Sequence, residues 1–245
     1  MDNQTTNFEK FIITYNEIDD FMRRELNLDE TISHSDMINK LVKRSRVFAA
    51  YKHELLLFAK LRNAIVHNPE KKDADPIAEP HDNIVIRYES IKQKVLDPPK
   101  ALDSIAVKAD CIYTTSLEAK AINVMKIMNN NTYTHVPVVE DGMFFGVFSE
   151  NTIFSYMTKK EEIILERDVK IREFIEQIPI DKHESEFFEF VPRDTLVVDI
   201  EEMFQKELMD RKRLAVVFIT QNGKPNEKLI GMVTAWDIAG YNRNI

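Results

Sequence analysis

Apolar residues in the first hundred positions recur at steps of three and four, the spacing that places them on one face of an α-helix. Thr5, Thr6 and Asn7 precede the first such run and can cap its helix. The pattern ends at Pro98-Pro99, since proline disfavours helical geometry in the residue before it. It predicts a bundle of four helices, over residues 5–26, 36–42, 47–66 and 82–96, in a helical domain at 1–98.

Beyond residue 100, short apolar runs typical of strands alternate with helical spacing, and this alternation occurs twice. Turns at Asp141-Gly142 and Asn222-Gly223 favour a hairpin in each copy, because glycine accepts a positive φ without steric cost. The first copy has expected strands at 111–113, 135–139 and 143–148, and expected helices at 116–128 and from 150. The second has expected strands at 188–191, 214–219 and 228–233, and expected helices at 196–208 and from 235. These are βαββα repeats, at about 101–160 and 166–245, that would bury their apolar faces on each other, so the predicted fold class is α+β.

The composition is typical of a globular protein, with 44% hydrophobic and 30% charged residues. Residues 1–100 have 16 basic and 17 acidic side chains, whereas residues 101–245 have 17 and 24. This acidic half argues against sequence-independent nucleic-acid binding there. The single cysteine, Cys111, excludes an internal disulfide and is expected to be buried in a strand. Neither a signal-peptide pattern nor an apolar run of about 20 residues is found, so a cytoplasmic location is expected.

Two segments at equivalent points of the repeat, GVFS at 146–149 and GMVTAWD at 231–237, share one pattern. A glycine is followed by two apolar residues, Ser or Thr, two variable residues and Asp. After an apolar strand pair, this pattern resembles the end of a CBS domain, and the resemblance covers about residues 101–245. It implies a Bateman module, in which a pseudo-two-fold axis relates two CBS repeats and adenosine derivatives bind in the clefts between them.

The second copy carries the complete motif. Thr234 would end a strand at the start of the last helix, where unpaired N–H groups can hold a phosphate. Asp237, one turn later, could accept hydrogen bonds from both ribose hydroxyls, and Lys212 and Arg213 could pair with phosphates. Val191, at the end of an expected strand, is a further candidate ligand contact. Alternatively, Thr234 and Asp237 only cap the last helix.

The first copy departs from the motif. Ser149 takes the Ser or Thr position, but Thr152 replaces Asp, and a hydroxyl cannot bind a diol as an ionised carboxylate does. Ribose binding is therefore expected at the second copy rather than the first. His135, two residues before Pro137, could contact a phosphate or could be a partly exposed strand histidine.

The long apolar helix of the N-terminal half ends in Arg-Asn-Ala-Ile-Val-His, at residues 62–67. Its Arg and His, five positions apart in a helical bundle, resemble the motif of HEPN domains, over about residues 5–97. The resemblance implies dimers and, in many members, a metal-independent ribonuclease with Arg62, Asn63 and His67 as the matching residues. His67 could move the proton of a ribose 2′-hydroxyl, and Arg62 could hold the phosphorane oxygens. Alternatively, His67 stabilises the helix end and Arg62 covers apolar surface.

Together these features predict a regulatory protein, in which a CBS pair senses AMP, ADP or ATP and controls the helical domain or a homodimer. A ligand-gated ribonuclease acting on RNA and a dimerisation module that binds nothing are the alternatives. The sequence has no glycine-rich phosphate loop and no His/Cys cluster with metal-ligand spacing, so no metal is expected. No membrane partner is expected either, because no apolar run is long enough to span a bilayer.

Overall fold

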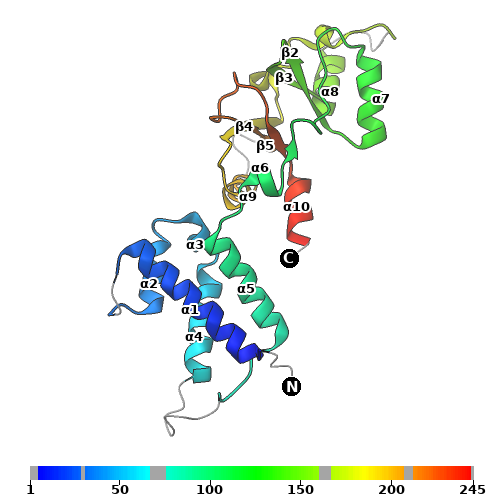
Figure 1. Ribbon diagram of the computed structural model, residues 1–245. Helices are drawn as coiled ribbons and strands as arrows, with labels where there is room; N and C mark the ends of the chain where they lie inside the picture. The colour runs from blue at the N-terminus through cyan, green and yellow to red at the C-terminus, as the bar shows by residue number, and fades with distance from the viewer. Residues whose placement is uncertain (1–4, 29–30, 67–75, 160–166, 207–211, 244–245) are drawn as a thin grey trace. The chain divides into compact units, whose positions relative to one another are not determined.

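A computed structural model describes residues 5–28, 31–66, 76–159, 167–206 and 212–243 of the 245-residue chain (Figure 1). The chain divides into two compact units, Met1–Pro99 and Lys100–Ile245. Within the described ranges, no helix has the length and apolar character needed to span a bilayer.

The N-terminal unit is helical, as the apolar spacing predicts. Its helices are α1 (Asn7–Leu26), α2 (His34–Leu41), α3 (Arg46–Ala50), α4 (Lys52–Val66) and α5 (Asp82–Leu96). α1 begins at a capping box, in which the Thr6 hydroxyl accepts from the Glu9 N–H and the Glu9 carboxylate accepts from the Thr6 N–H. The expectation of one helix over 47–66 is wrong, because the backbone leaves helical geometry at Tyr51, with φ −99° and ψ 10°.

Aromatic rings from three helices form the centre of this unit. Phe11 of α1, Phe58 of α4 and Tyr88 of α5 have ring centroids 4.4–6.1 Å apart and are almost completely buried. Burying three large rings on one another is a major source of apolar stabilisation for a bundle of this size. α1, α4 and α5 therefore share one core (Figure 1).

The C-terminal unit alternates helices and strands. Its helices are α6 (Ala101–Ser104), α7 (Ala121–Asn131), α8 (Glu150–Thr158), α9 (Val197–Gln205) and α10 (Ala235–Arg243), with 3-10 turns η1 (Ile171–Phe174) and η2 (Ile180–Lys182). Its strands are β1 (Val107–Lys108), β2 (His135–Glu140), β3 (Met143–Ser149), β4 (Glu186–Pro192), β5 (Arg213–Thr220) and β6 (Gly231–Val233). One sheet has the order β1-β6-β5-β4, with β4 and β5 parallel and the other pairs antiparallel, and β2 and β3 form a separate antiparallel pair.

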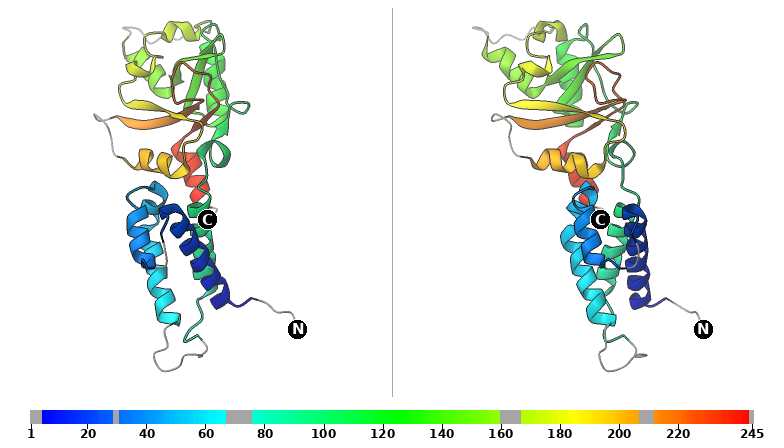
Figure 2. Two further views of the ribbon diagram at one scale, coloured as in Figure 1. Left: turned by 60° about the vertical axis from the view of Figure 1, so that its left-hand side comes forward. Right: turned by 90° about the vertical axis from the view of Figure 1, so that its left-hand side faces the viewer.

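The strand β5 is buried on both faces. Val216 and Phe218 join a cluster with Val147 of β3, whereas Val217 and Ile219 pack into a different cluster with α9. Successive side chains of a strand point to opposite faces, so β5 has the first repeat on one side and α9 on the other (Figure 2). The apolar layer between the two sheets joins the repeats.

The expected strand at 111–113 is wrong. The N–H groups of Cys111 and Ile112 both donate to the carbonyl oxygen of Lys108, which closes a turn directly after β1. Cys111 is consequently exposed, and its expected burial is wrong too. The strand instead lies earlier, at β1, where it pairs with β6 and adds an edge strand to the sheet of the second repeat.

Candidate functional site

A cavity of about 670 Å³ opens in the C-terminal unit between the two repeats. Its volume falls in the range of small-molecule sites, which is about 300–1,000 Å³. Residues of the first repeat, from 107 to 135, contribute most of its wall, and the motif of the second repeat contributes the rest. The lining residues are Val107, Cys111, Ile112, Tyr113, Asn131, Thr132, Tyr133, Thr134, His135, Met232, Thr234, Trp236 and Asp237.

The motif pair Thr234 and Asp237 stands at the junction of β6 and α10. The Asp237 carboxylate accepts two hydrogen bonds at Oδ2, from the Thr234 N–H and from the Thr234 hydroxyl, both at 2.7 Å. The bond from the Thr234 N–H to the Asp237 side chain is one half of a capping box at the start of α10. Both hydrogen bonds fall on Oδ2, and both residues line the cavity.

Aromatic rings form the apolar part of the cavity wall. Tyr113 and Tyr133 are stacked, with centroids 6.4 Å apart and planes 21° from parallel. Trp236 is 82% exposed, an unusual degree of exposure for an indole. Flat heteroaromatic ligands stack favourably on rings of this kind, so the wall suits a base or a similar ring.

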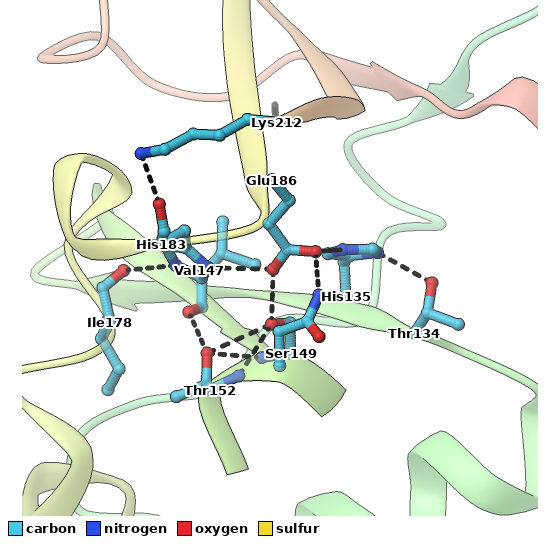
Figure 3. Close-up of polar contacts among 10 residues, drawn as sticks. Thr134, His135, Val147, Ser149, Thr152, Ile178, His183, Glu186 and Lys212 are labelled. Atoms are coloured by element: carbon cyan, nitrogen blue, oxygen red, sulfur yellow. Dashed lines mark hydrogen bonds and ion pairs between the residues drawn. The ribbon is translucent and has the colours of Figure 1, made fainter. Parts of the chain in front are cut away.

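A second polar cluster surrounds Glu186 at the start of β4 (Figure 3). The carboxylate is completely buried and accepts four hydrogen bonds. Oε1 accepts from Ser149 Oγ at 2.7 Å and from His183 Nδ1 at 2.9 Å. Oε2 accepts from Asn151 Nδ2 at 2.6 Å and from His135 Nε2 at 3.0 Å. Glu186 thus connects the second repeat to the end of β3 and the start of α8 in the first.

The pKa of the Glu186 carboxyl reflects these partners. Burial by itself raises the pKa, but the hydrogen bonds from His135, His183 and Ser149 outweigh burial and hold the pKa of that carboxyl well below its usual range. The side chain is therefore a carboxylate, which can serve as acceptor for all four donors.

Because the pKa of Glu186 is lower in the folded state, the unfolding free energy of this unit decreases at acidic pH. Glu186 stabilises the fold fully above the ordinary glutamate pKa of 4.5, and this contribution is lost as the pH falls towards the lower pKa of the folded state. We expect the difference in unfolding free energy between wild type and Glu186→Gln to shrink between about pH 7 and about pH 3, as linkage requires. Urea unfolding of both proteins at the two pH values measures it, and an equal difference at both would contradict the assignment of an ionised Glu186.

The same cluster buries Ser149 and Thr152, the residues of the first repeat that match the ligand motif. Ser149 and Thr152 are each 1% exposed. The Ser149 hydroxyl donates to Glu186, and the Thr152 hydroxyl lies 3.3 Å from the carbonyl oxygen of Val147. The two residues also form a capping box at the start of α8, in which each side-chain oxygen accepts the other's N–H. Their polar atoms are thus engaged within the protein, and neither residue is among the described lining of this cavity.

The structure separates the other candidate ligand contacts. His135 lines the cavity and also reaches Glu186, so it lies between the two polar sites. Lys212 Nζ donates to the carbonyl oxygen of His183 at 2.6 Å, on the Glu186 side (Figure 3). Arg213 of β5 lies opposite Glu186 of β4 in the register of the two parallel strands. Val191 is buried in the apolar cluster that includes residues of α9. Lys212, Arg213 and Val191 are absent from the described lining of the cavity.

Two features of the site escape the sequence patterns. Glu186 and its partner His183 belong to no sequence motif. The one signal of burial is the alternation along β4, because Glu186 lies two residues before Phe188 and so shares its buried face. Tyr113 and Tyr133 lie in irregular segments between the regular elements, where aromatic residues give no periodic signal.

In the N-terminal unit, Arg62 and Asn63 lie at the end of α4. The Arg62 guanidinium stands 5.2 Å from the ring centroid of Tyr15, and Nη1 lies 3.4 Å from Asn63 Oδ1. The Tyr15 ring stacks on the His34 ring, and His34 Nδ1 is hydrogen-bonded to Asp19. Burial lowers the pKa of His34. His67 lies outside the described residues, so the ribonuclease alternative stays a prediction. Among the residues that the structure describes, no group of three or more His, Cys, Asp or Glu side chains is placed to hold a metal ion.

Comparisons with known proteins address the C-terminal unit. The sequence model described as the CBS domain matches residues 108–159. A CBS domain protein from Streptococcus pneumoniae TIGR4 is 15% identical, with 67% of this chain and 92% of that chain covered and a TM-score of 0.43. A CBS domain-containing protein of unknown function from Bacillus anthracis is 11% identical, with 59% of this chain and 93% of that chain covered and a TM-score of 0.43. CBSX2, solved in complex with AMP, is also 11% identical, with 60% of this chain and 97% of that chain covered and a TM-score of 0.42. No curated protein matches the chain.

The matched segment spans the turn after β1, α7, the β2–β3 hairpin and α8, which are the elements of the first repeat. The HEPN resemblance of the N-terminal unit has no counterpart in these comparisons and stays a prediction. Over residues 108–159, the first repeat of this chain is thus similar in sequence to CBS domains.

Proposed function

We propose that this is a regulatory protein whose C-terminal unit binds an adenine-containing ligand in the cavity lined by Thr234 and Asp237. The observation that carries the proposal is the cavity itself, about 670 Å³ in volume and lined by residues of both repeats. CBS domains are often regulatory and sense nucleotides, which supports the same assignment.

Within this proposal, each part of the ligand has a matching part of the wall. The base stacks on the ring of Tyr113 or Tyr133, since flat π-systems prefer offset stacking. The ribose diol donates to Asp237, whose carboxylate can only accept. Because both repeats line the cavity, a bound ligand favours the arrangement in which the two walls face each other. It can shift the output, through the helical unit or the pairing of two chains, only by its differential affinity for two arrangements.

Thermal unfolding with and without ligand tests the proposal. At a ligand concentration about 100-fold above Kd, binding to the folded state adds about 2.7 kcal/mol of stability. We therefore expect at least one of adenosine, AMP, ADP and ATP to raise the Tm by several degrees. Asp237→Ala should abolish the rise, because it removes the acceptor for the diol.

Asp199 provides a matched control. It occupies the same third position of its helix, α9, and accepts from the Leu196 N–H, but it does not line the cavity. Asp199→Ala should lower the Tm of the free protein by a similar amount and leave the ligand-induced rise intact. If no adenine compound raises the Tm, or if Asp237→Ala keeps the full rise, the proposed function is wrong.

A further inference from the structure

The starts of α8 and α10 hold equivalent places in the two repeats, but their surroundings differ. Ser149 directly precedes α8 and Thr234 directly precedes α10, in each case where the second strand of a hairpin gives way to a helix. Thr234 lines the cavity, whereas Ser149 is 1% exposed. The group that covers Ser149 is the carboxylate of Glu186, whose Oε1 accepts from Ser149 Oγ at 2.7 Å. A buried anion of the chain itself therefore distinguishes the two helix starts.

Three of the four donors to this carboxylate belong to the first repeat. They are Ser149 Oγ, Asn151 Nδ2 and His135 Nε2, at 2.6–3.0 Å from a carboxylate oxygen (Figure 3). His135 lies directly opposite Ser149 in the register of β2 and β3, so the two side chains share one face of the hairpin. Asn151 follows in the first turn of α8. The end of the hairpin and the start of α8 thus present a set of donors that matches the acceptor atoms of a carboxylate.

The electrostatics of this position favour an anion. A helix start carries partial positive charge, and α8 begins directly beside the carboxylate. Lys212 adds a cation next to the cluster, since its Nζ donates to the carbonyl oxygen of His183 at 2.6 Å. Glu186 responds as a bound anion does, because its hydrogen bonds lower the pKa of the carboxyl although burial by itself would raise it.

From this arrangement we propose that the start of α8 is a binding site for a carboxylate, and that the chain fills this site with its own Glu186. Glu186 is then an internal ligand, supplied by the second repeat and bound by donors of the first. The adenine-containing ligand of the proposed function consequently finds one site in each chain, at Thr234 and Asp237, and none at Ser149. This consequence rests on the proposed function, whereas the carboxylate site does not.

Replacing the internal ligand by a free one tests the proposal. Glu186→Ala removes the Cγ methylene and the carboxylate, and acetate supplies the same heavy atoms. At about pH 7, where acetate is ionised, we expect acetate to raise the Tm of this variant by at least about 4 °C in a saturable way, since it binds the folded state. Thermal unfolding of the full chain followed by circular dichroism measures the rise. Acetamide, which is neutral and accepts at one atom only, should have little effect.

Two proteins in which the site is filled are the controls. The wild type and Glu189→Ala, which changes the same strand outside the cluster, should respond to acetate no more than to sodium chloride at equal ionic strength. If Glu186→Ala is unfolded without acetate, recovery of its circular dichroism on adding acetate takes the place of the Tm shift. An acetate effect on Glu186→Ala that is no larger than that of chloride, or one that is equal in all three proteins, would overturn the proposal.

The number of bound ligands provides a second test. Calorimetric titration of the wild-type chain with AMP should give a stoichiometry of about one, because Glu186 already fills the position at Ser149. Two AMP molecules bound to each chain would overturn the assignment of an internal ligand while leaving the proposed function in place. If no adenine compound binds, the proposed function is wrong, and the response of Glu186→Ala to acetate alone decides this inference.

Discussion

Replacing Glu186 by alanine should lower the unfolding free energy of the C-terminal unit by about 3–5 kcal/mol, the usual cost of breaking a buried charged network. The substitution leaves Ser149, Asn151, His135 and His183 without the acceptor that they share. Each buried donor left without a partner costs about 1–3 kcal/mol. Because Glu186 joins residues of both repeats, the loss should destabilise the packing between them rather than one local contact.

Two companion variants separate charge from packing. Glu186→Gln keeps the volume, but its amide can accept at only one atom, so it should be intermediate in stability. Glu189→Ala, in the same strand but outside the cluster, should change the stability by less than about 1 kcal/mol, as is usual for substitutions away from buried networks. Urea unfolding followed by circular dichroism measures these changes, and amide hydrogen exchange of β5 assigns them to the C-terminal unit. A Glu186→Ala protein within about 1 kcal/mol of wild type would show that the cluster is not a stabilising network.

Gly146→Ala should be the second strongly destabilising change, at about 3 kcal/mol, near the upper end for overpacking. A Cβ atom at this position would lie 2.4 Å from the carbonyl oxygen of Ile178 and 2.7 Å from its Cγ2 atom. That carbonyl accepts from the Val147 N–H at 2.9 Å, so it cannot move away without breaking a hydrogen bond. The contact is between β3 and the segment that leads to η2, and relief of the clash would require the backbone to shift.

The equivalent glycine of the second repeat is the control. At Gly231 the nearest atom to an added Cβ is Leu102 Cδ1, at 2.9 Å, which is the end of a flexible side chain. Gly231→Ala should therefore cost about 1 kcal/mol or less, within the range of well-tolerated core changes. Equal losses of unfolding free energy in the two variants would contradict this reading, because the sequence motif treats the two glycines alike while the structure does not.

The sequence predicts those parts of the fold that depend on residues close together in the chain, such as helix caps and hairpin turns. The start of α1 follows from the Thr6 capping box, and the β2–β3 hairpin follows from the Asp141-Gly142 turn, where both residues have positive φ. The strand expected at 111–113 fails because an apolar triplet there is used to line a cavity, and the pairing partner of β1 lies more than a hundred residues away in β6. Periodicity carries no information on such a long-range pair.

The candidate site divides along the same line. Thr234 and Asp237 are predictable because they lie three residues apart and their geometry is set by one helix start. The Glu186 cluster is not predictable, since its partners Ser149 and His135 lie 37 and 51 residues away in sequence. Only the packed repeats bring these groups together, and they place Lys212 Nζ against the carbonyl oxygen of His183, outside the described lining of the cavity.

The most direct test of the central claim, that the cavity is a ligand site, uses the one tryptophan of the chain. Trp236 lines the cavity and is largely exposed in the free protein, so its fluorescence comes from the site alone. Titration with adenosine should change the intensity or shift the emission to shorter wavelength in a saturable way, because a bound ring displaces water from the indole. The same titration of Asp237→Ala should give no change. Emission that stays constant through the titration of the wild-type protein, with adenosine and with AMP, would contradict the claim.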